Sequence, residues 1–376
     1  SFPTRRSSDL VQLFLTVSTV SAEDNVTGDI GLNEENSNYL EIQDIDNSVL
    51  GNSESNNTLK ASSSTFKDLQ NIIDNAYVGD TITLNKDYTY TTGDSPIFIG
   101  KSITIDGKNH IIDGKLATKI LKIREEHVTI KNIKFINAKS INNDYGSAID
   151  WNGDYANLQY CSFNNNQGTK LGGVVYLHGT NGKISHCYFN NNKANDYGGA
   201  VYWNGTNGEL KNCSFNNNAA LNGDEGGAVY WFGANGFLSG CSFNNNNYAW
   251  NGGAVSWRGA NGKLSGCSFN NNTAKGSGGA VSWYGHDGKL MDCSFNNNTA
   301  WKGGAVHWHS GNGFLSACSF VNNHAKWGGG GAVWWYGDNG FLSACSFVNN
   351  HADGYGGAVY WWGLNQIGRA SCRERV

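Results

Sequence analysis

Basic residues are too few to give this chain the surface of a nucleic-acid-binding protein. Its 376 residues include 27 Lys and Arg against 31 Asp and Glu, for a formal net charge of −4. Binding to nucleic acid needs a basic patch or stripe that neutralises phosphates. Arginine is the scarcer of the two, since only Arg124 and Arg258 lie outside the first and last ten residues. We therefore expect no nucleic-acid partner.

Long apolar runs are also missing, so we expect no membrane-spanning helix. Residues 11–22 (VQLFLTVSTVSA) are too short to cross a bilayer. They end in small residues just before Glu23 and Asp24, as a signal peptide does at its cleavage site. A buried strand is the alternative interpretation. We expect residues 11–22 to be part of a signal peptide and the protein to be secreted or displayed at the cell surface.

Both ends of the chain differ in composition from everything between them. Residues 1–10 (SFPTRRSSDL) and 367–376 (IGRASCRERV) contain five of the seven arginines and resemble translated sequencing-library adapter. Segments of this kind are excluded from reasoning about the fold. We expect both to be artefacts, the natural chain to extend further at each end, and Pro3 and Cys372 to have no biological role.

Two short regions precede the regular part of the chain. Residues 23–64 are mostly Asn, Ser, Glu and Asp, which cannot bury enough apolar surface to offset their ordering entropy, so we expect a disordered linker. Residues 65–76 (TFKDLQNIIDNA) follow with helical periodicity and with Ser64 or Thr65 as the N-cap. The expected apolar face consists of Phe66, Leu69, Ile72, Ile73 and Ala76. We predict a short helix that covers the open end of a solenoid, with irregular early coils up to residue 145.

Residues 146–366 repeat one motif, Gly-Gly-Ala-Val-x-Trp-x-Gly-x-Asn-Gly-x-Leu-x-x-Cys-Ser-Phe-Asn-Asn-Asn, about every 26 residues. A fixed period of this length indicates stacked units that cannot bury their apolar faces alone. Gly-Gly and Asn-Gly interrupt every apolar stretch after four or five residues, which leaves no room for a helix. The repeat therefore predicts an all-β fold, a right-handed parallel β-helix of about nine coils in this region.

Comparison of the units indicates which side chains face inward. The residue between Val and Trp varies from Tyr to Ser, His and Trp, whereas Val and Trp scarcely change. Since the side chains of a strand alternate between its two faces, Val and Trp are expected inside and the variable residue outside. The same reasoning places Cys and Phe inside. The expected inner ladder is Trp203, Trp231, Trp257, Trp283, Trp308, Trp335, Cys213, Cys241, Cys267, Cys293, Phe215, Phe243, Phe269 and Phe295.

The three asparagines after each Phe have a structural explanation. Identical amides stacked along the coil axis can form hydrogen bonds with the copies above and below, and Asn tolerates a left-handed turn. Gly-Gly supplies the other corner of the coil.

A second set of aromatic residues is expected outside or next to outward positions. Exposed aromatic patches usually contact something, so these side chains are the candidate binding residues. They are Tyr202, Tyr230, Phe232, Tyr284, Trp334, Tyr336, Tyr360 and Trp362. The alternative, that the repeating Trp row is itself exposed and stacks on sugar rings, is disfavoured because that position hardly changes between repeats.

No metal or cofactor site is expected from the spacing of Cys and His. The cysteines repeat with the coil and lack Cys-x-x-Cys spacing, and an in-register ladder aims every thiol the same way, so free buried thiols are favoured over disulfides. His307 and His309 share one strand face, and His324 and His351 occupy the same place in successive repeats. Neither pair has a recognisable third ligand, which favours solvent-facing histidines.

Catalytic residues are not evident either. No pair of carboxylates and no Lys or Arg cluster recurs between coils, although β-helix enzymes commonly need such groups on one face. We therefore expect a protein that is not an enzyme.

Units such as GGAVYWNGTNGELKNCSFNNNAA (residues 198–220) and GGAVSWRGANGKLSGCSFNNNTA (residues 252–274) resemble the repeats of adhesin-like surface proteins of methanogenic archaea. Those repeats are in turn similar to the polymorphic outer membrane protein repeats of bacteria. The resemblance covers about residues 65–363, including ITIDGKNHIIDG (residues 103–114). It implies a pectate-lyase-like β-helix on a secreted or wall-attached protein that acts in adhesion without catalysis.

The leading hypothesis is an adhesin-like stalk that binds surface glycans or proteins of a partner cell through outward aromatic and Asn side chains. The alternative is a polysaccharide lyase or glycoside hydrolase on the same scaffold, and a third possibility is a spacer that binds nothing. The absence of loop insertions around a cleft favours the adhesin.

Overall fold

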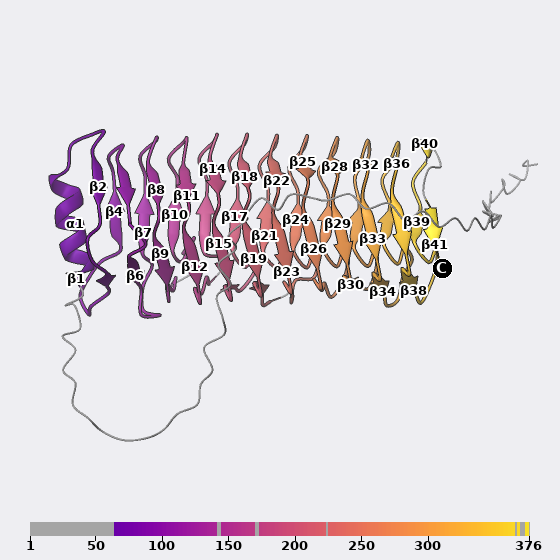
Figure 1. Cartoon of the computed structure of the whole chain (residues 1–376), viewed down its shortest axis with the longest axis horizontal. Helices are drawn as coiled ribbons and strands as arrows, with labels where there is room; N and C mark the ends of the chain where they lie inside the picture. Colours follow the sequence, from indigo (N-terminus) through magenta and orange to yellow (C-terminus); the bar gives the residue numbers. More distant parts are fainter. Residues whose placement is uncertain are drawn as a thin grey trace, which may run out of the picture. The chain divides into compact units, whose positions relative to one another are not determined.

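A computed structural model describes residues 64–140, 144–169, 173–222 and 225–364, together with the backbone of residues 367–368 and 373–375. Within these residues the chain winds into a stack of coils whose strands form three long parallel sheets of 13, 11 and 12 strands (Figure 1). The expectations for residues 1–10, 11–22 and 23–63 concern segments outside the described residues. Ser64, expected at the end of the linker, instead begins the first strand.

Each complete coil contributes one strand to each long sheet, whereas the first coil has helix α1 (Phe66–Asn75) in place of a strand of the 11-stranded sheet. The 13-stranded sheet contains β1 (Ser64–Thr65), β3 (Tyr88–Thr89), β6 (Ile111–Asp113), β9 (Lys134–Ile136), β12 (Ser162–Asn164), β15 (Tyr188–Asn190), β19 (Ser214–Asn216), β23 (Ser242–Asn244), β26 (Ser268–Asn270), β29 (Ser294–Asn296), β33 (Ser319–Val321), β37 (Ser346–Val348) and β41 (Arg373–Arg375). The 11-stranded sheet contains β4 (Ile97–Ile99), β7 (Leu121–Ile123), β10 (Ile149–Trp151), β13 (Val175–Leu177), β17 (Val201–Trp203), β21 (Val229–Trp231), β24 (Val255–Trp257), β27 (Val281–Trp283), β31 (Val306–Trp308), β35 (Val333–Trp335) and β39 (Val359–Trp361).

The third long sheet and two short ones complete the coils. The 12-stranded sheet contains β2 (Thr81–Thr83), β5 (Thr104–Asp106), β8 (Thr129–Lys131), β11 (Asn157–Gln159), β14 (Lys183–Ser185), β18 (Glu209–Lys211), β22 (Phe237–Ser239), β25 (Lys263–Ser265), β28 (Lys289–Met291), β32 (Phe314–Ser316), β36 (Phe341–Ser343) and β40 (Ile367–Gly368). The short sheets pair β16 (Lys193–Ala194) with β20 (Ala219–Ala220), and β30 (Thr299–Ala300) with β34 (His324–Ala325) and β38 (His351–Ala352).

Strand length and register determine what each coil buries. The strands of the regular coils have three residues, so the central side chain faces one way and its two neighbours the other. In β26 the central Phe269 is buried, whereas in β24 the flanking Val255 and Trp257 are buried. Neighbouring coils pair in register, Trp257 with Trp283 and Phe269 with Phe295, so like side chains stack on like.

The stacked side chains form continuous ladders through the interior. Successive Trp rings from Trp203 to Trp361 lie 4.4 to 4.9 Å apart between centroids. The Phe rings from Phe135 to Phe347 lie 4.7 to 5.0 Å apart. Every member of the expected inner ladder is at most 3% exposed, which places the repeating Trp row in the core.

The three asparagines of each repeat have three different positions. In one coil, Asn270 forms an outer amide ladder, its Nδ2 donating to Asn244 Oδ1 at 2.9 Å. Asn271 makes the turn with a φ of 54°. Asn272 is fully buried, and its Nδ2 donates to Asn298 Oδ1 at 3.1 Å. Both expected uses of Asn therefore occur, at separate residues.

Two glycines of the motif are required by geometry. Gly252, the first of Gly-Gly, has a φ of +66°, which L side chains rarely adopt. Gly262, after Asn261, lies against the indole of Trp257, and a Cβ there would come within 2.2 Å of its Nε1. The Asn-Gly pair thus turns the chain and leaves space for the buried Trp.

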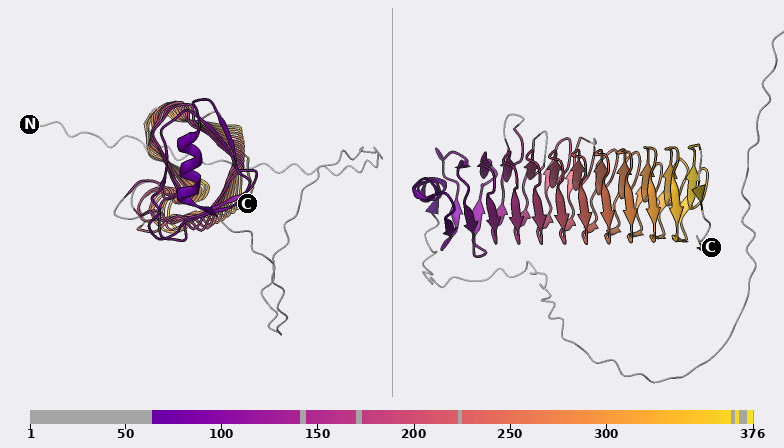
Figure 2. Two further views of the ribbon diagram at one scale, coloured as in Figure 1. Left: turned by 90° about the vertical axis from the view of Figure 1, so that its left-hand side faces the viewer. Right: turned by 90° about the horizontal axis from the view of Figure 1, so that it is seen from above.

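Helix α1 (Phe66–Asn75) lies across the open end of the first coil, as the end-on view of Figure 2 shows. Thr65 is its N-cap and forms a capping box with Asp68. Phe66, Leu69 and Ile73 are buried, as expected for a cap. Ile72 is the exception to the expected face, because its side chain is 42% exposed. Ile72 instead lines a hollow beside β2.

Residues 367–368 and 373–375, within a segment expected to be an artefact, form β40 and β41, which pair with β36 and β37. The open edge of the preceding coil offers unpaired N–H and C=O groups to any extended segment that follows it.

The seven cysteines from Cys161 to Cys318 are free and buried, as the sequence favours, and Cys345 is also buried. The Cys187 thiol donates to Ser185 O at 3.3 Å, and burial raises the pKa of this thiol.

Candidate functional site

One long face of the β-helix carries fourteen aromatic and histidine side chains outside the inner Trp and Phe ladders. It is the outer side of the 11-stranded sheet, and we call it the aromatic face. Its members are Tyr145, Tyr176, Tyr197, Tyr202, Tyr230, Phe232, Tyr284, His307, His309, Trp334, Tyr336, Tyr355, Tyr360 and Trp362. All eight candidate residues from the sequence belong to it.

The N-terminal half of the face is a row of tyrosines. Ring centroids are 5.2 Å apart for Tyr176 and Tyr202 and 4.8 Å apart for Tyr202 and Tyr230, while Tyr197 packs over Tyr230 at 4.9 Å. Desolvation raises the pKa of Tyr176 and Tyr202 to about 12, so both phenols stay neutral and can donate hydrogen bonds.

Tyr230 is predicted to face outward as a candidate binding residue, and only its direction agrees with a binding role. It does lie on the outer side of the sheet, but it is only 7% exposed, because Tyr197, Tyr202 and Phe232 surround it. Burial raises its pKa. Tyr230 therefore supports its neighbours instead of contacting a ligand directly.

Several residues that directly follow a core Trp carry exposed rings. Phe232 is 53% exposed, Tyr336 is 48% exposed and Trp362 is 62% exposed. Tyr284 is half-buried and stacks towards His309 at 5.1 Å, which in turn stacks on Tyr336 at 5.2 Å. These rings stand along one side of the face, where a flat ligand can reach them.

An ion pair holds the centre of the face. Glu225 is 6% exposed and accepts hydrogen bonds from the guanidinium of Arg258 and, at 2.9 Å, from Ser256 Oγ. The Arg258 guanidinium lies 3.7 Å from the centroid of the Tyr284 ring. Ser256 and Ser282 are fully buried beneath this cover. The pair is neutral overall and fixes Tyr284 in place.

The C-terminal half ends in a cluster of large rings. The ring centroids of Trp334 and Tyr360 are 5.1 Å apart, and those of Tyr360 and Trp362 are 6.2 Å apart. Lys302 Nζ lies 4.5 Å from the centroid of the Trp334 ring. Trp334 and Tyr360 are half-buried, so only part of each ring faces solvent. A hollow of about 500 Å³ adjoins the cluster and is lined by His309, Gly311, Tyr336, Gly337, Asp338, Trp362, Gly363 and Leu364.

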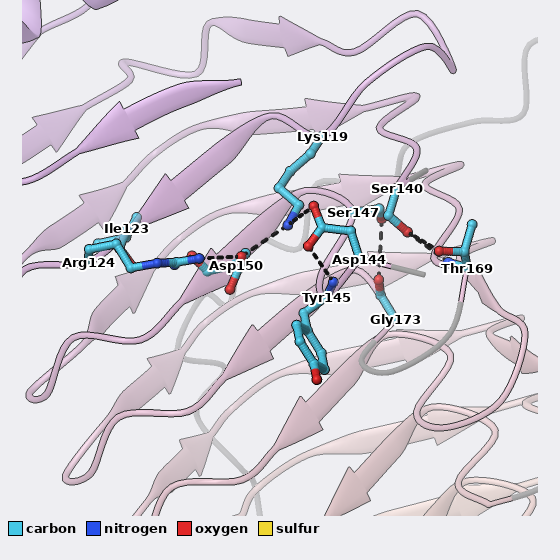
Figure 3. A network of polar contacts seen from close by, with 10 residues as sticks. All are labelled: Lys119, Ile123, Arg124, Ser140, Asp144, Tyr145, Ser147, Asp150, Thr169 and Gly173. Carbon is cyan, nitrogen blue, oxygen red and sulfur yellow. Dashed lines mark hydrogen bonds and ion pairs between the residues drawn. The ribbon is translucent and has the colours of Figure 1, made fainter. Parts of the chain in front are cut away.

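A polar network near the N-terminal end of the face was not found by sequence reasoning (Figure 3). Asp150 Oδ2 accepts from Lys119 Nζ at 3.0 Å and from Arg124 at 2.7 Å, and Lys119 also pairs with Asp144 at 2.7 Å. Lys119 and the Asp150 side chain are each 3% exposed. Two cations balance two carboxylates, which is what a structural ion cluster requires. The one signal in the sequence for this network is Asp150, which occupies the position between Ile149 and Trp151 where the other repeats usually have an uncharged residue.

A second row of exposed rings was also missed. Trp250, Trp301 and Trp327 lie on the loops that precede the Gly-Gly corner and are 49%, 48% and 80% exposed. The ring centroid of Trp301 lies 6.0 Å from that of Trp250 and 6.2 Å from that of Trp327. The short Ala-Trp-x-Gly-Gly segments at Trp250 and Trp301 were the available signal.

A larger hollow of about 910 Å³ runs along the corner between the 12- and 13-stranded sheets. Small residues line it, among them Gly240, Gly266, Ala317 and Ala344. Its lining contains no aromatic residue, so it offers no stacking surface. The aromatic face is therefore the stronger candidate for a surface that binds by stacking.

Residues 147–278 match the family described as "Right handed beta helix region". Residues 292–307 and 344–360 match the Chlamydia polymorphic membrane protein repeat. No curated protein matches the chain.

Two solved structures align with this chain, and the first of them supports the likeness of fold. A mannuronic acid specific polysaccharide family 6 lyase from human gut microbiota aligns with a TM-score of 0.53 and 14% identity over 80% of this chain and 77% of that chain. An alginate lyase aligns with a TM-score of 0.45 and 10% identity over 83% of this chain and 61% of that chain.

The fold and the repeats define the class of this protein, an all-β right-handed parallel β-helix with one short helix among the described residues. Within that class, the chain is a repeat protein with units similar to those of the polymorphic membrane proteins. The expected fold is thus confirmed. Among the described residues, no helix is both long and apolar enough to cross a membrane.

Proposed function

We propose that this protein is a non-catalytic adhesin-like β-helix that binds polysaccharide through the aromatic face. The observation that carries the proposal is the series of exposed rings, Phe232, Tyr336 and Trp362, supported from below by half-buried aromatic residues. Exposed aromatic surface of this extent is costly in water unless a partner covers it. Tyr336 and Trp362 lie on successive coils, about 4.8 Å apart along the axis, and Phe232 lies four coils earlier, so an extended chain of sugars can span the series.

Display at the cell surface or secretion is part of this proposal. It is supported by the expected signal peptide at residues 11–22 and by the repeats that resemble those of polymorphic membrane proteins. Surface glycans of a partner cell are the expected ligands, and surface proteins of that cell are the alternative.

The test is binding of the full chain to immobilised neutral and uronic-acid polysaccharides. Replacement of both Tyr336 and Trp362 by Ala should weaken binding at least about tenfold, equivalent to about 1.4 kcal/mol. Tyr188→Ala is the matched control, because Tyr188 is 58% exposed but lies on the 13-stranded sheet. Equal binding by the double variant and the native chain would remove the aromatic face from the proposal, and no binding at all would favour a spacer.

A polysaccharide lyase remains the second candidate, and the network of Lys119, Arg124 and Asp150 is the observation in its favour. Two basic groups beside one carboxylate could take part in proton transfer to and from a sugar. Lys119, however, is 3% exposed and already paired with two carboxylates, which argues against a catalytic base. The same polysaccharides should therefore show no new reducing ends and no unsaturated uronates. Their appearance, and their loss in Lys119→Ala, would favour the lyase.

A further inference from the structure

Two histidines and an aspartate meet on the short sheet formed by β30, β34 and β38. His324 and His351 are register partners on neighbouring coils, and Asp353 lies two residues after His351. Residues two apart on an extended segment point to the same side, which brings the Asp353 carboxylate beside both imidazoles. Asp353 is the third ligand that the spacing of the histidines alone did not identify.

The distances fit a shared cation. His324 Nε2 and His351 Nε2 each lie 3.0 Å from Asp353 Oδ1. The three candidate ligand atoms are all within 4.8 Å of one another. A zinc ion bound at about 2.0 to 2.2 Å by nitrogen and oxygen ligands holds those atoms about 3 to 4 Å apart. The atoms thus need only small side-chain rotations to bind one ion.

The backbone holds these residues in place without help from a metal. The backbone N–H groups of His324, His351 and Asp353 donate to Asn298 O, Asn323 O and Ala325 O at 2.9, 2.9 and 3.0 Å. Ligands on paired strands are positioned more precisely than ligands on free loops. This preorganisation distinguishes the cluster from a chance meeting of mobile surface side chains.

The chemistry of the three groups selects a class of ion. Imidazole nitrogens suit Zn²⁺, Cu²⁺ and Ni²⁺, whereas Ca²⁺ and Mg²⁺ prefer sites made of oxygen alone. The side chains of His324, His351 and Asp353 are 36%, 70% and 48% exposed, so an ion can enter from solvent. Three protein ligands leave a fourth position of a tetrahedral ion open to water or to an outside carboxylate.

We propose that His324, His351 and Asp353 form a binding site for one divalent transition-metal ion of the zinc class. The ion joins the coils that contain β34 and β38, and it replaces the protons by which the imidazoles now donate to Asp353. None of the three residues belongs to the aromatic face, although Asp353 lies two residues before Tyr355, and the proposal does not depend on glycan binding.

The test is titration of the tag-free full chain with Zn²⁺ by calorimetry after removal of metals with a chelator. One ion per chain should bind in the native protein, and saturating Zn²⁺ should raise the thermal unfolding midpoint. His351→Ala and Asp353→Asn should each lower the affinity at least about tenfold, since even loss of an outer partner of a ligand costs that much.

His286→Ala is the matched control for this titration. His286 also pairs with an aspartate, Asp287, at 2.6 Å, and its side chain is 65% exposed. Among the described residues, however, it belongs to no group of three side chains that could hold a metal ion. Its replacement should therefore leave the uptake of Zn²⁺ unchanged.

Co²⁺ in place of Zn²⁺ distinguishes this site from the buried thiols. Ligation by nitrogen and oxygen gives a visible spectrum without a thiolate-to-metal charge-transfer band. A strong thiolate band, unchanged affinity in both His351→Ala and Asp353→Asn, or the absence of Zn²⁺ uptake would each overturn the proposal. Loss of uptake in these two variants with retention in His286→Ala would support it.

Discussion

At the scale of single residues, the buried asparagine of each repeat makes contacts that no other side chain can reproduce. Asn272 Nδ2 donates to Phe243 O at 2.9 Å and to Asn298 Oδ1, and its Oδ1 accepts from Asn246 N at 3.0 Å. Asn272→Ala should leave buried backbone groups without partners, at about 1 to 3 kcal/mol for each. Urea denaturation measures the loss of unfolding free energy.

Asn270→Ala is the control for that experiment, because Asn270 belongs to the same coil but lies in the part-buried outer ladder. Its loss exposes amides of Asn244 and Asn296 that water can reach, so a cost below about 1 kcal/mol is expected. Equal destabilisation by the two variants would contradict the difference between the inner and outer ladders.

His307 gives the stability of the protein a dependence on pH. Desolvation, followed by the charges of His309 and Lys302, lowers the pKa of His307 from 6.5 to about 3. The unfolded chain therefore binds a proton that the native state rejects, and stability falls as pH falls through the window between these two values. The unfolding free energy should decrease by about 2 kcal/mol from about pH 7 to about pH 5 on account of this group.

His307→Gln should remove that part of the pH dependence, whatever its effect on stability at neutral pH. Denaturant unfolding of both proteins at the two pH values measures the difference. The same loss on acidification in both proteins would show that other groups are responsible.

The sequence predicts correctly which side chains point outward, but it does not predict how much of each side chain is exposed to solvent. The alternation around Trp231 places Tyr230 on the outer side, as the structure has it, yet Tyr230 is buried. Its cover comes from Tyr197 in the loop before the neighbouring coil. Contacts of this kind between coils depend on the conformation of loops, and the periodicity of the strands gives no information about loop conformation.

At the scale of elements, helix α1 illustrates how much a local motif can specify. Thr65 and Asp68 form a capping box, so the start of the helix is determined by two side chains close in sequence. Thr65→Ala should destabilise the cap by about 1 kcal/mol. Hydrogen exchange should show faster exchange in α1 and in β4, against which it packs, and no change in β31.

Lys67→Ala is a suitable control, since Lys67 is exposed and lies in the same first turn. Faster exchange throughout the coils in Thr65→Ala would contradict a locally acting cap and would indicate that α1 nucleates the whole stack.

The elements also show where prediction from sequence ended. The strands and the helix follow from periodicity and Gly-containing turns, and both were predicted. The aromatic face was predicted in part, because Phe232, Tyr336 and Trp362 follow core Trp residues at a fixed position. The loops that carry Trp250 and Trp301 vary in length, so their partners could not be inferred. The same holds for the network around Asp150, which joins residues 31 positions apart.

At the scale of the whole β-helix, each coil contacts only its neighbours, so stability should be close to a sum over coils. Such a stack tolerates removal of one complete unit but not of a fraction. Gly278 and Gly303 are equivalent corners with φ of +65° and +58°, and β27 pairs in register with β31. Deletion of residues 278–302 would therefore bring Val255 onto Val306 and restore the Trp and Phe ladders.

The variant that lacks residues 278–302 should keep the circular dichroism spectrum of the native chain and still unfold cooperatively. Its m-value, the slope of unfolding free energy against denaturant concentration, should fall in proportion to the surface that one coil buries. Deletion of residues 278–290 is the matched control. It removes only half a coil and places Met291 and strand β29 of the 13-stranded sheet where the Gly-Gly corner and the Val-x-Trp strand belong, so every following side chain would lose its register. The half-coil deletion should aggregate or lose cooperative unfolding. Similar stability of the two variants would mean that the coils do not need their register, contrary to the ladders of Trp, Phe and Asn that run through the stack.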